Sequence, residues 1–330
     1  MSFLRTEAER RMKESPLLRL ESLLDWQALG EVIGDLGRSG YGPTGYDPVA
    51  LLKSLILQAW HGLSDPGLEE ALRLRLDFML FTGFENAVPD ETTFCRFRNL
   101  LVQHGKWQEA LREVNRQLQA AGLQVTPTKG AVLDATIVES AARPRKHLET
   151  TAVDREEETT IFEVTGEHLS ADPDATWLKK GKRSYFGYKG FVTTDSTRGA
   201  IHRIHVTPAH VSEMVSLQAA LGDVCTEKLY ADKGYASREN RQFLKSRGSR
   251  GGLMYKAARG RPLSSWQKRA NKIISKSRYI VEQAFGTLKR RFSFARASYM
   301  TRVKVEAQLT LKAIAFNLVK ALRQERCAYS

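Results

Sequence analysis

The N-terminal third of the chain carries apolar side chains at the spacing of amphipathic helices. The clearest segments begin after a Ser or Asp that can cap the first turn, and the first two end at a glycine. These segments cover residues 48–60, 65–82 and 91–101. In the third segment Phe94, Phe97 and Leu101 share one side, whereas Arg96 and Arg98 lie elsewhere on the helix. The pattern predicts a bundle of short helices with exposed arginines, suited either to reading DNA or to packing and dimerisation.

Beyond this region the pattern changes to short runs of β-type residues separated by turn residues. The run 131–138 is apolar on both faces, which is typical of a central strand, and Asp134 is the charged residue in its middle. Further strands are expected at 185–194, 200–207, 227–232 and 253–255, and further helices at 212–221, 237–245, 264–292 and 303–324. The polar stretch 141–184 is interpreted as an insertion or mobile loop. We therefore expect a helical N-terminal domain, residues 1–128, and an α+β domain, residues 129–330.

The composition is that of an ordinary globular protein. Apolar residues make up 42% of the chain, yet no apolar run reaches the roughly 18 residues that a membrane span needs. The charged N-terminus has no apolar signal core, so we expect a cytoplasmic protein without a membrane partner. Cys95, Cys225 and Cys327 are isolated from one another, which argues against a zinc cluster or a disulfide framework.

Positive charge is concentrated in the C-terminal part of the chain. The net charge is +14, yet residues 233–330 hold 24 Lys and Arg against four Glu and no Asp, so the first 232 residues are net negative. Such asymmetry indicates nucleic acid or an anionic membrane as partner. Because the cations are spread over several predicted elements and a Gly-rich turn, rather than over one amphipathic helix, nucleic acid is the preferred partner.

Three acidic residues fall where an acid needs an explanation. Asp134 lies inside an apolar strand, Asp232 ends another strand, and Glu282 is the only acid in the basic stretch 240–305. A buried carboxylate without a partner is costly and neighbouring carboxylates repel one another, so a cluster of three is stable mainly around a cation. Two Asp and one Glu suit Mg²⁺, which prefers oxygen ligands. Two such ions can activate water or a 3′-hydroxyl at a phosphodiester.

Each of these acids also has a structural alternative. Asp134 can pair with an arginine, and Asp232 can cap the helix that begins near Ser237. Glu282 can pair with Arg278, which lies one helical turn before it. Taken singly, these alternatives remain open, and the three acids have to meet in space for the catalytic interpretation to hold.

The predicted helix 264–292 has one face with groups suited to a DNA backbone. At 100° per residue, a sector of about 60° contains Arg278, Glu282, Phe285 and Lys289. This face therefore combines a candidate metal ligand with an aromatic ring and two cations, which are the groups expected beside a phosphodiester that is cut.

Several short motifs occur in a specific order over roughly residues 45–320. They are PDETTFCRFR at 89–98, VLDAT at 132–136, DPDATW at 172–177, KKGK at 179–182, YFGYK at 185–189, HVTPA at 205–209 and ADKGY at 231–235. In this order they resemble the DDE transposases of bacterial insertion sequences, in the superfamily numbered four and five and most closely in its fifth group. The resemblance implies an α+β, ribonuclease-H-like core, in which a mixed sheet is flanked by helices.

The resemblance also implies the chemistry of the site. Asp134, Asp232 and Glu282 are the expected catalytic residues and metal ligands, with two Mg²⁺ or Mn²⁺ ions per active site. The family signature around its Glu is Tyr-x2-Arg-x3-Glu-x6-Lys, but Ser275 stands at the Tyr position. The stacking role of that tyrosine is therefore open here, and the candidates to replace it are Tyr279 and Trp266.

The expected partner is double-stranded DNA, both terminal inverted repeats and target DNA. The predicted DNA contacts are Arg96, Arg98, Trp177, Lys179, Lys180, Lys189, Lys233, Arg278, Lys289 and Arg290. Trp177 can stack on an unpaired end base while the neighbouring lysines contact phosphates, although it can equally anchor its own loop.

The predicted function is therefore a transposase that cleaves at the ends of its element and joins the 3′-hydroxyl to target DNA. A homodimer is expected because two ends have to be held together, and the location is the bacterial cytoplasm, at the nucleoid. One alternative is a sequence-binding or architectural DNA-binding protein that does not cleave. Another is a nuclease on the same fold without strand transfer.

Overall fold

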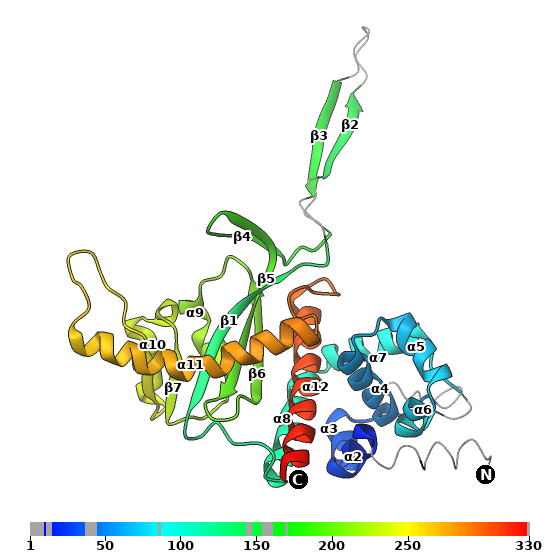
Figure 1. Ribbon diagram of the computed structural model, residues 1–330. Helices are drawn as coiled ribbons and strands as arrows, with labels where there is room; N and C mark the ends of the chain where they lie inside the picture. Colours follow the sequence, from blue (N-terminus) through cyan, green and yellow to red (C-terminus); the bar gives the residue numbers. More distant parts are fainter. Residues whose placement is uncertain are drawn as a thin grey trace.

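The C-terminal helix lies between a group of N-terminal helices and a mixed β-sheet (Figure 1). The computed structural model describes residues 10, 15–36, 45–84, 87–142, 147–153, 161–168 and 171–328. Parts of the predicted N-terminal domain and of the stretch 141–184, and the side chain of Cys327, lie outside the described residues. In the described part of the chain, no helix is long and apolar enough to cross a membrane.

The helices and strands follow one another in three stretches. The N-terminal helices are α2 (Pro16–Leu23), α3 (Trp26–Ile33), α4 (Pro48–His61), α5 (Asp65–Leu74), α6 (Leu76–Thr82), α7 (Glu91–Gln103) and α8 (Lys106–Ala120). The strands are β1 (Ala131–Glu139), β2 (His147–Val153), β3 (Ile161–His168), β4 (Thr176–Lys180), β5 (Arg183–Asp195), β6 (Ile201–Pro208), β7 (Lys228–Ala231) and β8 (Arg250–Leu253). The later helices are α9 (Glu213–Leu221), η1 (Lys233–Tyr235), α10 (Arg238–Ser246), α11 (Ser265–Arg291) and α12 (Arg302–Ala328).

β1 lies at the centre of the main sheet, as its apolar sequence predicted. It pairs antiparallel with β5, which pairs with β6, and parallel with β7, which pairs with β8. The order β6-β5-β1-β7-β8, with helices on both faces, confirms the expected α+β, ribonuclease-H-like architecture. Leu133 lies beside Ala231 in the register, so the next residues, Asp134 and Asp232, are neighbours across two strands.

Alternate residues of β1 pack on opposite faces of the sheet. Ala131 and Leu133 belong to a core that α9 and α10 cover. Val132 and Val138 belong to the larger core, which includes residues of α11 and α12. Asp134 has the same parity as these two valines, so its side chain lies on the α11 face of the sheet.

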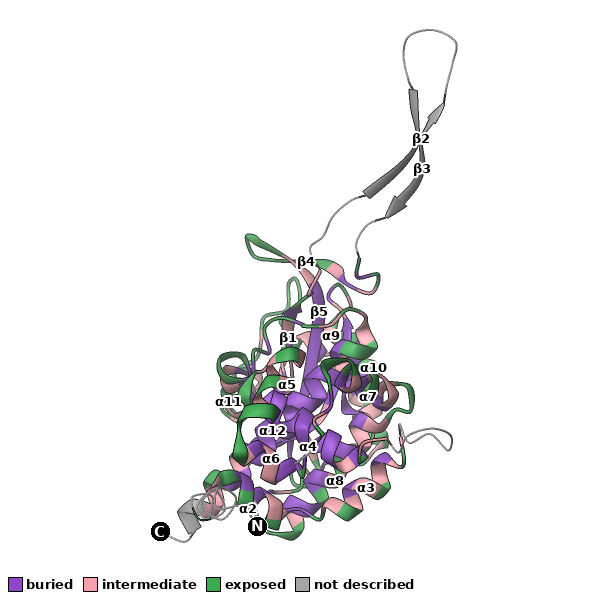
Figure 2. Cartoon of the chain, turned by 90° about the vertical axis from the view of Figure 1, so that its right-hand side faces the viewer, coloured by how far each residue is buried: buried purple, intermediate pink, exposed green. Residues whose placement is uncertain are grey.

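α12 joins the N-terminal helices to the sheet. Residues 307–319 are all buried, and Figure 2 shows α12 and α4 as largely buried helices. The Asn317 amide donates to Asn115 Oδ1 (2.8 Å) and to the Ile201 carbonyl (2.7 Å), so one side chain links α12 to α8 and β6. The expected domain boundary at residue 128 falls between α8 and β1, and the hydrophobic core is continuous across it.

The predicted helix 65–82 is two helices, because the chain bends at Arg75. This residue is extended (φ −99°, ψ 110°), so it ends α5 and precedes α6. Leu72 and Phe78 are both fully buried. An uninterrupted helix would turn six residues through 600°, which leaves these two side chains about 120° apart. The bend therefore allows both of them to reach the core.

β8 begins at Arg250 and ends at Leu253, earlier than the predicted strand. The sequence pattern missed it because two of its residues are glycines, which rarely mark a strand interior. A Cβ on Gly252 would lie 2.7 Å from the carbonyl oxygen of Leu229 in β7. Close pairing of these two parallel strands therefore requires a glycine at this position.

Part of the polar stretch 141–184 is regular structure, so of its two interpretations the mobile loop is wrong there, while the insertion stays a prediction. β2 and β3 pair as a separate antiparallel ribbon that extends away from the body (Figure 1). β4 pairs antiparallel with the first residues of β5, and we call residues 176–187 the β4–β5 arm. Within it Trp177 lies opposite Phe186, with ring centroids 5.4 Å apart. β4 forms because it pairs with β5, and its sequence has no alternating apolar pattern that would have predicted a strand.

Asp172 anchors the base of the β4–β5 arm. Its buried carboxylate accepts hydrogen bonds from the Ser140 and Tyr188 hydroxyls and from the Thr301 backbone N–H (3.1 Å). These groups belong to the segment after β1, to β5 and to the segment before α12. Burial and the bond to Asp172 raise the pKa of Tyr188. The bond also holds Thr301 in a left-handed backbone conformation (φ 74°), which is uncommon for a residue with a side chain.

Arg98 was expected on the exposed side of its helix, and this expectation is wrong. The residue is only 5% exposed. Its guanidinium donates to both carboxylate oxygens of Asp65 (3.0 and 2.6 Å) and lies 4.3 Å from the ring centroid of Tyr299. Arg98 therefore links α7 to the start of α5 and to the segment before α12, and is not free to contact DNA.

Removal of the Asp65 carboxylate tests this pair. Asp65→Ala leaves the Arg98 guanidinium buried without its counter-charge, so we expect the free energy of unfolding to fall by about 3–5 kcal/mol. The control is Glu109→Ala, which removes the more exposed partner of Lys106 (2.8 Å) and should cost less than about 1 kcal/mol. Urea unfolding followed by circular dichroism measures both, and equal losses would contradict the structural role of Arg98.

Candidate active site

Two aspartates from adjacent parallel strands converge on one arginine. Asp134 lies in β1, and Asp232 follows the last residue of β7. Nη2 of Arg278 in α11 donates to Asp134 Oδ2 at 2.8 Å, and Nη1 lies 3.5 Å from Asp232 Oδ1. The side chains of Arg278 and Asp134 are each 15% exposed, so solvent screens this contact only weakly. Asp134 therefore pairs with an arginine, as its structural alternative proposed. That arginine is Arg278, which lies one helical turn before Glu282.

The backbone next to each aspartate orients its carboxylate. Asp134 Oδ1 accepts the N–H of Ala135 (2.9 Å), and Asp232 Oδ1 accepts the N–H of Lys233 (2.7 Å) at the start of η1. Ser237 caps α10 through its hydroxyl, so the alternative that Asp232 caps that helix is wrong. Each carboxylate is therefore oriented by a hydrogen bond from the N–H of the next residue, in addition to its contact with Arg278.

α11 carries Arg278 within its buried stripe. The helix begins with a capping box in which Ser264 and Gln267 exchange side-chain and backbone hydrogen bonds. Its buried residues are Ile274, Val281, Ala284, Phe285 and Leu288. Phe285 is 9% exposed, so the expectation that its ring faces DNA is wrong. Helical spacing correctly put Arg278 and Phe285 on one face, but that face packs on the sheet.

Glu282 lies one turn beyond Arg278, at the exposed edge of that face. Among the residues that the structure describes, no three His, Cys, Asp or Glu side chains form a group that could hold a metal ion. Burial opposes the charge of Arg278, but Asp134 and Asp232 outweigh it and raise the pKa of the arginine. The structure thus brings the two aspartates together around a cation and leaves Glu282 beside them on the helix.

The donor set nevertheless fits a hard divalent cation. Carboxylate oxygens of two aspartates lie within reach of one positive group, and a third acid is a helical turn away. In the described part of the chain, the buried Tyr235 hydroxyl and Arg278 Nε have no hydrogen-bond partner. Burial raises the pKa of Tyr235, and Asp134 raises it further, so the hydroxyl lies near the carboxylates. Such an unpaired group marks a place for water or a ligand.

Sequence reasoning missed Glu213, the first residue of α9. Its carboxylate is half-buried, with Oε1 3.9 Å from Lys189 Nζ. Burial raises the pKa of Glu213; Lys189 opposes this shift, and Asp134 and Asp232 add to it. In the sequence Glu213 follows a helix-capping Ser212, where an acid is ordinary, so no local signal distinguished it.

Lys189 was expected to contact DNA, and the structure contradicts this. The residue is 8% exposed, and its ammonium donates to the Val211 carbonyl (2.9 Å). Burial lowers the pKa of Lys189, while nearby Glu213 acts to raise it. Because β5 alternates its side chains, Lys189 falls on the inner face under α9 rather than on the outer surface.

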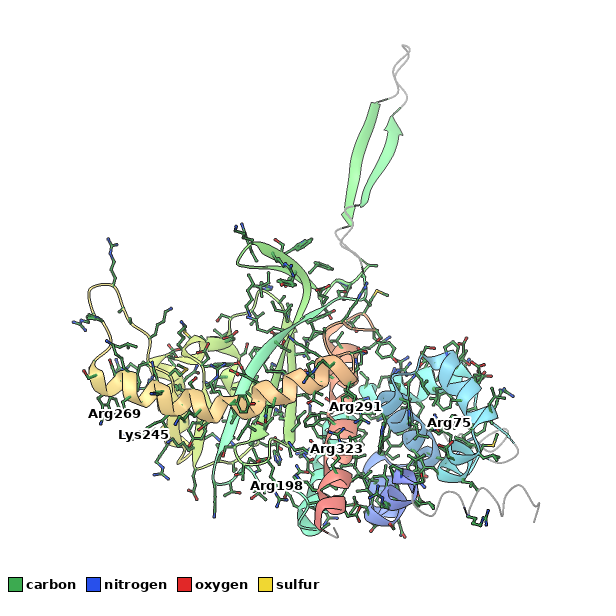
Figure 3. The ribbon with its side chains drawn as sticks, viewed as in Figure 1. Arg75, Arg198, Lys245, Arg269, Arg291 and Arg323 are labelled. Atoms are coloured by element: carbon green, nitrogen blue, oxygen red, sulfur yellow. The ribbon has the colours of Figure 1, made fainter. Side chains whose placement is uncertain are left out.

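Most of the other residues predicted to contact DNA are exposed. Exposed side chains include Arg96, Trp177, Lys179, Lys180, Lys233, Lys289 and Arg290. Burial lowers the pKa of Lys289, and Lys180 on the β4–β5 arm lowers it further, so these two ammonium groups are close. Figure 3 shows Arg269 and Arg291 near opposite ends of α11, so both ends of this helix carry positive charge.

Comparisons with known proteins show the family of the chain. Residues 127–318 match the family described as "Transposase DDE domain", and residues 5–100 match "Transposase domain (DUF772)". A protein of Neisseria meningitidis serogroup B named "Transposase for insertion sequence element IS1106" is 41% identical over 259 residues, which are 78% of this chain and 85% of that protein. A cryo-EM structure of a piggyBac transposase synaptic complex with hairpin DNA aligns with a TM-score of 0.45 and 10% identity, over 93% of this chain and 73% of that one. The chain therefore belongs to the DDE transposases of bacterial insertion sequences, enzymes that cleave DNA and depend on divalent metal ions.

Proposed function

We propose that the protein binds the terminal inverted repeats of its own insertion sequence, cleaves the DNA at the element ends and joins the freed 3′-hydroxyl to target DNA. The observation that carries this proposal is the convergence of Asp134 and Asp232 on one cation from adjacent strands. Glu282 lies one turn along the helix that supplies this cation, on its exposed side. A DNA phosphate can approach from that side, because the Glu282 side chain is exposed in the described part of the chain.

Asp134, Asp232 and Glu282 are the side chains that would hold two Mg²⁺ or Mn²⁺ ions. Ions held there supply an activated water or 3′-hydroxyl and stabilise the leaving oxygen of a phosphodiester. Arg278 keeps the two aspartates together and adds a permanent positive charge that attracts the phosphate. The buried residues of α11 fix the position of Glu282 relative to Asp134 and Asp232, since the helix cannot slide along the sheet without exposing its core residues.

The strand path runs between the β4–β5 arm and α11. Burial lowers the pKa of Lys289 and the charge of Lys180 lowers it further, so an anion bound beside these lysines would favour the charged form of Lys289. A phosphate group is such an anion. Trp177 is 54% exposed on the same arm and can stack on a base at the cut end. Lys179, Arg290 and Lys233 add exposed charge on either side.

Two element ends have to be held together for transposition, so we propose that the protein acts as a homodimer. The helical N-terminal region, residues 1–128, is the part proposed to bind end DNA or the second copy. Arg96 supports the first role, because it is exposed on α7 while the neighbouring Arg98 is committed to Asp65.

Neutralising Glu282 separates binding from cleavage. Glu282→Gln should bind end DNA with wild-type affinity, because the exposed side chain supports no core contact, and should lose cleavage by at least about 100-fold in Mg²⁺. Gel-shift and nicking assays with a labelled end oligonucleotide measure the two properties. Glu239→Gln, an exposed acid on α10, is the control and should cleave normally. Cleavage that survives in the Glu282 variant would refute its role.

The basic surface should make binding of end DNA depend strongly on salt. Affinity should fall steeply between about 50 and 200 mM salt, and Lys179→Ala/Lys180→Ala should reduce the slope of log K against log salt by about 1–2. The control Lys106→Ala/Arg116→Ala removes the same charge from α8 and should leave the slope unchanged. Fluorescence anisotropy measures the slopes, and identical slopes for both double variants would exclude the arm from the DNA path.

Arg278 should compete with divalent ions for the two aspartates. Arg278→Met leaves Asp134 and Asp232 to repel each other, so in EDTA it should melt several degrees below wild type. Added Mn²⁺ should stabilise this variant more than it stabilises wild type, since the ion no longer has to displace a bound guanidinium. Lys276→Met, exposed on the same helix, is the control for calorimetry. Equal gains from Mn²⁺ in all three proteins would mean that Arg278 does not compete with the ion for the aspartates.

A further inference from the structure

Glu213 reaches the site from the side of the sheet opposite to α11. It begins α9, whose buried residues belong to the core on the α9 and α10 face. A Cβ added to Gly234 would overlap its Oε2 atom, so the carboxylate rests against the backbone two residues after Asp232. Glu213 is therefore next to the turn that presents the second aspartate.

Its pairing with Lys189 does not account for this position. The nearest approach between the two side chains is 3.9 Å, while the ammonium makes its hydrogen bond at 2.9 Å to the Val211 carbonyl. A half-buried carboxylate near two others is repelled by both, and a loose pair with one lysine offsets this poorly. The arrangement lacks the short contacts that a purely structural ion pair would have.

Tyr235 is an independent sign of a ligand at this place. Its side chain is fully buried and its hydroxyl has no partner among the described residues. Glu213 and Asp134 both act on this hydroxyl, so it lies among the carboxylates. A buried hydroxyl in such surroundings is normally satisfied by ordered water.

We propose that Glu213 is a metal-positioning residue, whose carboxylate accepts hydrogen bonds from water bound to the divalent ion that Asp134 and Asp232 hold. Mg²⁺ keeps several of its waters in protein sites, and acids beyond the direct ligands orient them. The Tyr235 hydroxyl, which has no partner among the described residues, would bind the same water. Gly234 is required because any side chain there displaces the Glu213 carboxylate. This inference rests on the proposed function, and adds an acid from α9 to those on β1, β7 and α11.

The first test is Mn²⁺ affinity, measured on the full-length protein without DNA from the EPR signal of free Mn²⁺. Glu213→Gln should weaken binding by about 10- to 100-fold, as loss of an acid that orients bound water does elsewhere. Glu239→Gln should bind as wild type does. Glu213→Asp, which keeps the charge, should recover part of the loss. A residue that only paired with Lys189 would leave Mn²⁺ affinity unchanged.

The second test uses Gly234 and does not alter any acid. Gly234→Ala is sterically possible for the backbone and meets only the end of the Glu213 side chain, so the protein should fold. It should weaken Mn²⁺ binding in the wild-type background and have no further effect in Glu213→Gln. If the Glu213 variants are unstable, Gly234→Ala alone still tests the proposal, because wild-type Mn²⁺ affinity in this variant would contradict it.

The outcomes separate the two proposals. Wild-type Mn²⁺ affinity in both Glu213→Gln and Gly234→Ala, together with weak binding in Asp134→Asn, would overturn the role of Glu213 and leave the active site intact. Wild-type affinity in Asp134→Asn would overturn the proposed function as well. Additive effects of Gly234→Ala and Glu213→Gln would also overturn the inference, because they would mean that the glycine acts through something other than Glu213.

Discussion

The structure depends on one electrostatic constraint: two aspartates on neighbouring parallel strands share a shielded positive charge. Asp134 occupies a position on β1 that its neighbours fill with apolar side chains. An acid there is stable only with a cation, and Arg278 supplies one from α11. Because the same guanidinium also reaches Asp232, the helix and both strands have to keep one relative position.

The rest of the fold maintains that position. α11 packs its apolar stripe on the sheet, and α12 continues the same core to the N-terminal helices. Asp172 ties β5, the end of β1 and the start of α12 together at one edge. The β4–β5 arm grows from this anchored base, so its lysines and Trp177 extend from a rigid support. A polar stretch that had suggested a loop thus contains both the Asp172 anchor and the exposed side chains of the β4–β5 arm.

Most errors of sequence reasoning concern which side of an element faces water. Arg98, Lys189 and Phe285 were expected to meet DNA, and all three are buried. Periodicity groups residues on one face, and it grouped Phe285 with Arg278 correctly, but it placed Arg98 apart from Phe94 and Phe97, with which it is buried. Whether that face is covered depends on elements far away in the chain: α5 for Arg98, α9 for Lys189, and the sheet for Phe285. Long polar side chains add to the ambiguity, because they reach a buried partner as easily as solvent.

Sequence alone determined a helical N-terminal part followed by an α+β part, the central place of β1, the basic character of the C-terminal part and the three candidate acids. These follow from local patterns of apolar, turn and charged residues, which operate over a few positions. Only tertiary structure decided that Asp134 and Asp232 meet at Arg278, that Glu282 stays at the exposed edge, and that Glu213 approaches from the opposite side of the sheet. Those placements depend on contacts between segments distant in the chain, for which single-sequence periodicity carries no information.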